Sequence, residues 1–360
     1  MTARRHRTTP IGSALAIAAL GAVTAGLVLA SPLRVQAQNS QSTLAQDPAC
    51  QAVHPAAAGA PMPQSQDLAV LRFLGTANYE LSYRGQILLF DAFYSRVPPA
   101  RPLGVLPSDF TRADAIFIGH GHWDHIADAP EVAAQTGAKV YGGPPTTEWL
   151  AMMGVPESQL VTWKGGETQQ FDGFTVQAIH GAHSGSRPPA VGRLMSLYGE
   201  SIDELVRPQT ADEQAQLKAL RSRGTGGPRV SAEGTLTYML TFDNGYRIVY
   251  ADTNGAITDE ARAVMANIPR TDITIVPYAG RFNADLQNRA SMPYVHTYKP
   301  RVVLPSHHED ETGVGAHFDM PVYGLGMAVR DAFPDARTID PLYLSALCFD
   351  TRTKDLFIGR

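Results

Sequence analysis

The sequence predicts a layered α/β protein, and three features of the chain support this fold class. Short apolar runs typical of strands alternate with segments of helical period along most of the 360 residues. Strand pairs joined by tight turns come early, as at 79–83 and 86–90, and Asn244-Gly245 joins a later pair. The apolar run 115–119 is typical of a strand that is buried on both faces.

Composition and net charge limit the classes of function that the protein can have. Hydrophobic residues make up 44% of the chain and charged residues 18%, so a large core can form and global disorder is excluded. The formal net charge is −4, and residues 1–37 carry four arginines and no acid. The remainder is therefore more acidic than the whole chain, which argues against a nucleic-acid partner. A small anionic substrate stays possible, because a metal ion can supply positive charge locally.

The N-terminus has the pattern of a signal peptide over residues 1–37. Arginines at 4, 5 and 7 precede a weakly apolar run, and Val35-Gln36-Ala37 offers a cleavage site. We therefore expect a periplasmic or secreted protein with no integral membrane domain after cleavage. The alternative is an uncleaved N-terminal anchor, because the apolar run can just span a bilayer.

Composition also divides the rest of the chain. Residues 38–66 are rich in Ala, Pro, Gln and Ser and are expected to form a flexible linker before one domain over 67–360. Within that domain, residues 184–234 are expected to form a helical insertion that covers one face of the core. The two cysteines, Cys50 and Cys348, either form one disulfide or remain separate thiols.

Four candidate metal ligands follow the buried run 115–119. They are three imidazoles and one carboxylate within six residues: His120, His122, Asp124 and His125. Such a set suits zinc, or another borderline divalent metal such as iron or manganese. Surface loop histidines alone would not require this spacing, so the motif predicts a metal site.

This motif resembles the signature of metallo-β-lactamase-fold hydrolases, and the likeness covers roughly residues 68–315 apart from the insertion. Segments 74–77 and 89–93 resemble the opening strands of that superfamily. The resemblance implies a four-layer αββα sandwich with a helical insertion. It also implies two divalent metal ions, zinc for preference with manganese or iron as alternatives.

The resemblance implies three further ligands, each at the end of a strand. His183 fits the pattern of the third histidine, with His180 as the alternative. Asp252 fits the aspartate that bridges the two metals, ahead of Asp243 and Asp272. His307 fits the last histidine, with His308 as the alternative. The first metal would then be held by His120, His122 and His183, and the second by Asp124, His125 and His307.

The implied chemistry is hydrolysis by a hydroxide that bridges the two metals. An aspartate at position 252 resembles the broader hydrolase branch of the superfamily, and residues 74–77 with the position of His307 look most like the branch of lactonases and N-acylphosphatidylethanolamine phospholipase D. The expected substrate is therefore an ester, lactone or phosphodiester. A small-molecule or lipid-like substrate is expected, and Asp124 could orient the nucleophile or relay its proton. A non-catalytic metal or ligand binder is the alternative, and β-lactam hydrolysis is disfavoured. The sequence makes no prediction of oligomeric state.

Overall fold

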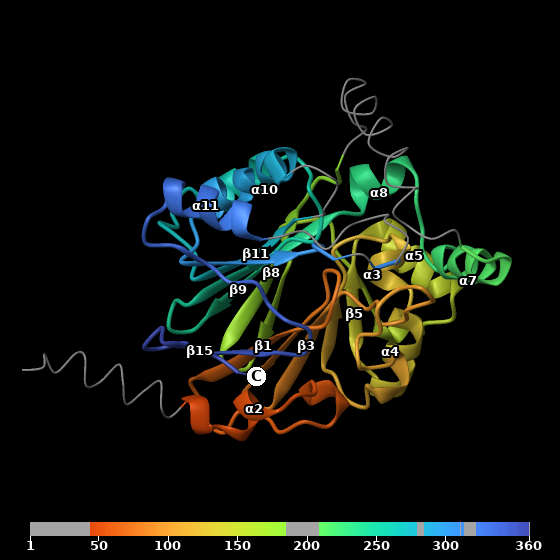
Figure 1. Ribbon diagram of the computed structural model, residues 1–360, viewed down its shortest axis with the longest axis horizontal. Helices are drawn as coiled ribbons and strands as arrows, with labels where there is room; N and C mark the ends of the chain where they lie inside the picture. Colours follow the sequence, from red (N-terminus) through yellow and green to blue (C-terminus); the bar gives the residue numbers. More distant parts are fainter. Residues whose placement is uncertain (1–43, 185–208, 279–283, 310, 313–321, 360) are drawn as a thin grey trace, which may run out of the picture.

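Two mixed β-sheets pack face to face, and helices cover the outer face of each sheet (Figure 1). The computed structural model describes residues 44–184, 209–278, 284–309, 311–312 and 322–359. The predicted signal peptide at 1–37 lies outside this described part. Among the described residues, no helix is long and apolar enough to cross a membrane.

The first sheet has the strand order β15-β14-β1-β2-β3-β4-β5-β6. The neighbours from β15 to β3 pair antiparallel, and β3 to β6 pair in parallel. The strands are β1 (Leu68–Phe73), β2 (Tyr79–Tyr83), β3 (Gln86–Phe90), β4 (Ala115–Phe117), β5 (Lys139–Gly142), β6 (Leu160–Thr162), β14 (Ala346–Asp350) and β15 (Leu356–Ile358).

The second sheet has the strand order β13-β12-β11-β10-β9-β8-β7. Strands β10 to β13 run parallel, whereas β7 to β10 form antiparallel neighbours, so β8, β10 and β12 point the same way. The strands are β7 (Thr168–Phe171), β8 (Phe174–His180), β9 (Leu236–Phe242), β10 (Arg247–Tyr250), β11 (Ile273–Pro277), β12 (Val302–Ser306) and β13 (Arg337–Thr338).

Helices form the two outer layers (Figure 1). The first sheet is covered by α4 (Ala129–Thr136) and α5 (Pro144–Met152). The second is covered by α9 (Asp259–Met265), α10 (Ala284–Tyr298) and α11 (Tyr323–Ala332). The other described helices are α2 (Pro48–Gln51), α3 (Trp123–Ile126), α7 (Ala211–Arg221) and α8 (Pro228–Glu233), with single turns of 3₁₀ helix at Ala56–Ala58, Pro107–Asp109 and Glu157–Gln159.

Three hydrophobic clusters separate these four layers. An aromatic-rich cluster that includes Phe117, Tyr238 and Tyr250 lies between the sheets. One cluster lies under α4 and α5, and another lies under α9 to α11. Strands such as β4 are therefore buried on both faces, which explains their continuous apolar runs. The predicted four-layer αββα sandwich is confirmed.

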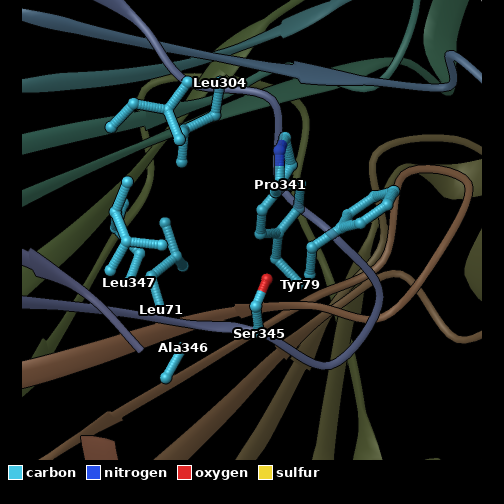
Figure 2. A pocket seen from close by; sticks show the side chains of 10 residues that line it. Leu71, Tyr79, Leu304, Pro341, Ser345, Ala346 and Leu347 are labelled. Carbon is cyan, nitrogen blue, oxygen red and sulfur yellow. The ribbon is translucent and has the colours of Figure 1, made fainter. Parts of the chain in front are cut away.

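A small cavity between the sheets is a packing gap. Its volume is about 10 Å³, and Figure 2 shows that Leu71, Leu304 and Leu347 line it. A space of about 10–15 Å³ holds at most one water molecule. Tyr79 also lines it and donates a hydrogen bond from its hydroxyl to the carbonyl of Pro305, at 2.9 Å. This bond joins β2 of one sheet to β12 of the other.

Residues 44–66, which belong to the expected linker 38–66, pack onto the first sheet. Cys50 and Cys348 form a disulfide with an S–S distance of 2.03 Å, which joins α2 to β14. Of the two alternatives for the cysteines, one disulfide or two separate thiols, the structure shows the disulfide. The buried Glu80 carboxylate accepts hydrogen bonds from the amides of Ala56 and Ala57, each at 2.7 Å. These contacts fix a segment whose composition alone suggests disorder.

The described part of the predicted insertion contains α7 and α8. Thr210 caps α7 with its side-chain oxygen, and Glu213 completes the capping box. Residues 185–208 lie outside the described residues.

Candidate metal centre

All seven predicted ligands lie at the carboxyl ends of four strands. His120 follows β4, and the three remaining ligand-bearing loops follow β8, β10 and β12. These three strands point the same way, so their ends meet at one edge of the second sheet. The end of β4 faces them from the first sheet, because Tyr238 of β9 donates a hydrogen bond to the Ile118 carbonyl at 2.7 Å. The structure thus brings together residues up to 187 positions apart in the chain.

The first candidate group comprises His120, His122 and His183, with one ligand nitrogen from each lying within 4.8 Å of the others. His120 Nε2 lies 3.0 Å from His122 Nδ1. The ring of His183 lies 4.7 Å from that of His120 and 4.5 Å from that of His122, measured between centroids. His120 is buried, whereas His122 and His183 are partly exposed. This group therefore forms the open side of the cluster.

The second group comprises Asp124, His125 and His307. Asp124 and His125 stand in the first turn of α3, so a turning backbone directs both side chains into the cluster. Asp124 Oδ2 lies 3.1 Å from His307 Nε2 and 3.6 Å from His125 Nε2. The two imidazoles and the carboxylate are buried, so this group is the inner half of the cluster.

Asp252 lies between the two groups. Its Oδ2 atom lies 2.5 Å from His120 Nδ1 and 3.4 Å from His125 Nδ1. A Cβ atom on Gly119 would lie 2.2 Å from the carboxyl carbon of Asp252, so only glycine fits there. Two roles are compatible with this position: a bridge between two metals, or a carboxylate that orients the His120 ring.

Asp91 contacts the cluster on the side of His125 Nδ1. It follows β3 in the left-handed region, with φ +57°. Its Oδ2 atom lies 2.6 Å from His125 Nδ1 and accepts a hydrogen bond from the Tyr250 hydroxyl at 2.5 Å. Its Oδ1 atom accepts the Gly119 amide at 2.8 Å. These bonds fix the His125 ring with Nε2 directed toward Asp124.

Replacing Asp91 with alanine should weaken metal binding by about 10–100-fold, because the imidazole of His125 loses the carboxylate that orients it. Isothermal titration of the metal-free protein with zinc would measure this. Replacing the exposed Asp243 with alanine is the matched control, because that residue lies in a hairpin turn away from the cluster. Unchanged affinity in the Asp91 variant would show that Asp91 serves the turn alone.

The electrostatics of the cluster favour a cation. Burial lowers the pKa of His120 well below its usual value and that of His122 to about 4, so both rings are neutral and have a free lone pair. Burial raises the pKa of Asp91 to about 6. Although burial alone would lower it, Asp124 and Asp91 raise the pKa of His125 to about 10. A field that holds a proton this strongly also attracts a metal ion.

The donor set and its spacing fit divalent metals. Zinc bound tetrahedrally at 2.0–2.1 Å separates neighbouring ligand nitrogens by about 3.3 Å. The 3.0 Å between His120 and His122 and the 3.1 Å between Asp124 and His307 are close to this value. Each group offers three donors, which leaves a coordination position for water or substrate. Imidazole and carboxylate donors also suit manganese or iron.

The alternative ligands lie elsewhere. His180 Nε2 is 3.2 Å from the carbonyl of Ala232, so its ring faces the end of α8. His308 Nε2 is 3.2 Å from Asp340 Oδ1, and its ring stacks on Phe73. Asp272 is buried at the start of β11, where Lys354 contacts it at 2.9 Å. The structure therefore favours His183, His307 and Asp252 by position.

The end of the insertion packs against the metal-binding motif. The Thr225 amide donates a hydrogen bond to the Gly121 carbonyl at 2.7 Å. Arg223 contacts the buried Asp128 at 2.8 Å, and Leu220 packs with Phe93 beside Trp123. The Trp123 side chain therefore packs against Phe93 at this junction. These contacts join α7 to the loop that carries His122, and no sequence pattern predicts them.

Comparisons with known proteins agree with this architecture. Residues 86–198, which contain five of the seven candidate ligands, match the beta-lactamase superfamily domain. A UPF0173 metal-dependent hydrolase from Cupriavidus necator is 25% identical over 266 residues, covering 71% of this chain and 80% of that protein. A second one, from Roseiflexus castenholzii, is 25% identical over 230 residues, covering 62% of this chain and 75% of that protein.

A solved structure supports the fold. Igni18, a metallo hydrolase from the archaeon Ignicoccus hospitalis, superposes with a TM-score of 0.52 at 16% sequence identity, covering 78% of this chain and 98% of that protein. The sheet order, the clustered ligands and these matches lead to one conclusion: the chain has the metallo-β-lactamase fold and is similar to metal-dependent hydrolases of that superfamily.

Proposed function

We propose that this protein is an exported dinuclear hydrolase that cleaves an ester, lactone or phosphodiester. The observation that carries the proposal is the placement of two donor groups side by side, with Asp252 in contact with both. A single structural metal would need only one of these groups. Two groups that each leave a coordination position suit hydrolysis.

The chemistry divides between the metals and the chain. Two divalent metals, when bound, lower the pKa of a shared water and polarise the carbonyl or phosphoryl oxygen of the substrate. His120, His122 and His183 would hold one ion, and Asp124, His125 and His307 the other, with Asp252 bridging. Asp124 is the proposed proton relay, because its carboxylate faces the same centre. Burial alone would raise the pKa of Asp124, but the charge of His125 holds it well below its usual range.

Substrate approaches from the side of His122 and His183, the two partly exposed ligands. The proposed substrate is a small or lipid-like molecule. The buried disulfide supports the proposed periplasmic or secreted location, because disulfides persist in oxidising compartments.

Metal removal tests the proposal. We expect the purified protein to hold about two equivalents of metal and to hydrolyse at least one of p-nitrophenyl butyrate, a γ-lactone and bis(p-nitrophenyl) phosphate. Chelation should lower kcat/KM by about 10²–10⁴-fold, because the metals supply several kcal/mol of transition-state stabilisation. Adding back zinc, manganese or iron separately should restore it and rank the metals.

Two outcomes would contradict the proposal. Activity that survives complete metal removal would exclude metal-dependent hydrolysis. Tight binding of two metals without turnover of any substrate on the panel would indicate a non-catalytic binder. Including nitrocefin on the panel tests β-lactam hydrolysis at the same time.

A further inference from the structure

A buried ion pair lies beside the loop that carries His307. Arg96 Nη2 and Glu309 Oε1 are 2.9 Å apart, and their side chains are only 4% and 5% exposed. Both charges converge on Thr76 in the turn between β1 and β2. Glu309 accepts hydrogen bonds from the Thr76 amide and from its hydroxyl, the latter at 3.2 Å. Arg96 contacts the same hydroxyl at 2.9 Å.

Thr76 in turn contacts the backbone of His307. The Thr76 carbonyl accepts the His307 amide at 2.5 Å. Both residues lie in the left-handed region, with φ +52° for Thr76 and +60° for His307. Non-glycine residues adopt this conformation at a cost, and they keep it only where their surroundings impose it. The ion pair and the hydrogen bonds around Thr76 supply such surroundings.

The turn between β1 and β2 lies close to the Arg96–Glu309 ion pair. Gly75 has φ +91°, and a Cβ atom there would lie 3.1 Å from both Arg96 Nη2 and Glu309 Oε1. The Arg96 guanidinium also stacks on the ring of Phe93, 4.3 Å from its centroid. Thr76, Gly75 and Phe93 therefore surround the ion pair, and Thr76 links it to His307.

We propose that Arg96, Glu309 and Thr76 act as a positioning unit that holds His307 in the orientation needed to bind the second metal. The inference rests on the proposed function, since it assigns His307 to a metal. No hydrogen bond or ion pair described in the structure joins Arg96 or Glu309 to a candidate ligand side chain. They act through the backbone of His307, so their loss should affect one donor group and spare the other.

The test replaces both charges together, because removing one would leave the other buried and unpaired. In the Arg96→Met/Glu309→Met variant, we expect affinity for the second cobalt ion to fall by about 10–100-fold. Affinity for the first ion should change by less than about threefold, because His120, His122 and His183 do not contact the unit. A visible-absorption titration with Co²⁺ distinguishes the two ions. Arg96→Met/Glu309→Gln keeps a neutral acceptor for the Thr76 amide without leaving a charge unpaired, and it should recover much of the lost affinity.

Hydrogen exchange of the metal-free protein gives a second readout that needs neither metal nor substrate. The His307 amide should exchange at least about tenfold faster in the double variant, because its acceptor is no longer fixed. Asp272→Asn is the matched control: it alters a buried acid paired with Lys354, and it should leave His307 exchange unchanged.

The outcomes separate this inference from the proposed function. Wild-type protein that fails to bind two metals contradicts the proposed function, while the exchange comparison still decides whether the unit holds His307. Equal weakening of both metal ions, or unchanged exchange at His307 in the double variant, would overturn the positioning role.

Discussion

Replacing Asp252 with alanine should lower kcat/KM by about 10²–10⁴-fold and reduce bound metal from about two equivalents to about one. The carboxylate lies 2.5 Å from His120 and 3.4 Å from His125, so it contacts a member of each donor group. Without it, two cations would lie side by side with one fewer negative charge between them. Steady-state kinetics on the panel substrate and elemental analysis of the purified variant measure the two effects.

Asp243→Ala is the matched control, because the same change is made at an exposed aspartate that precedes β10 by four positions. It should leave both quantities unchanged. A variant at 252 that keeps both metals, with affinity lowered only about 10–100-fold, would contradict the bridging role. That result would assign Asp252 to orienting His120, which its short contact with His120 Nδ1 also permits.

Local patterns in the sequence were sufficient to predict the layered α/β fold class and the His120–His125 motif, whereas the superfamily resemblance supplied the four-layer order and the three further candidate ligands, which the structure brings close to the motif. A buried apolar run ending in His120 marks a strand end, and Asp252 and His307 repeat this arrangement. The carboxyl ends of strands that point the same way meet at one edge, so these residues converge. The choice of His183 over His180 came from the superfamily pattern, and the structure places the two rings in different surroundings.

Other features depend on contacts that no local pattern encodes. Arg96 and Glu309 are separated by 213 positions, and neither stands in a recognisable motif. The segment 44–66 has the composition of a linker, yet it is ordered by contacts with the rest of the chain. Arg72, the one charged residue of β1, donates hydrogen bonds to the carbonyls of Ala49 and Ala52, at 3.1 and 2.8 Å.

The Cys50→Ala/Cys348→Ala variant should lose about 2–5 kcal/mol of unfolding free energy. The disulfide closes a loop with a sequence separation of 298, so it restricts nearly the whole described chain in the unfolded state. For a protein of this size the loss corresponds to a fall in Tm of roughly 5–15 °C. Differential scanning calorimetry of both proteins measures it. Activity at 25 °C should be unchanged, because the bond joins α2 to β14, on the side of the first sheet remote from the ligand-bearing strand ends.

Reduction of the wild type provides the matched control, because it removes the same bond without changing the sequence. Both cysteines are fully buried, so dithiothreitol alone should reduce the bond slowly, and reduction should become fast only in denaturant. If the variant melted within about 2 °C of the oxidised wild type, the cross-link would contribute little. The hydrogen bonds from Arg72 and to Glu80 would then be sufficient to hold residues 44–66 on the sheet. A large fall in Tm with unchanged activity would instead show that the disulfide stabilises the sandwich independently of the metal centre.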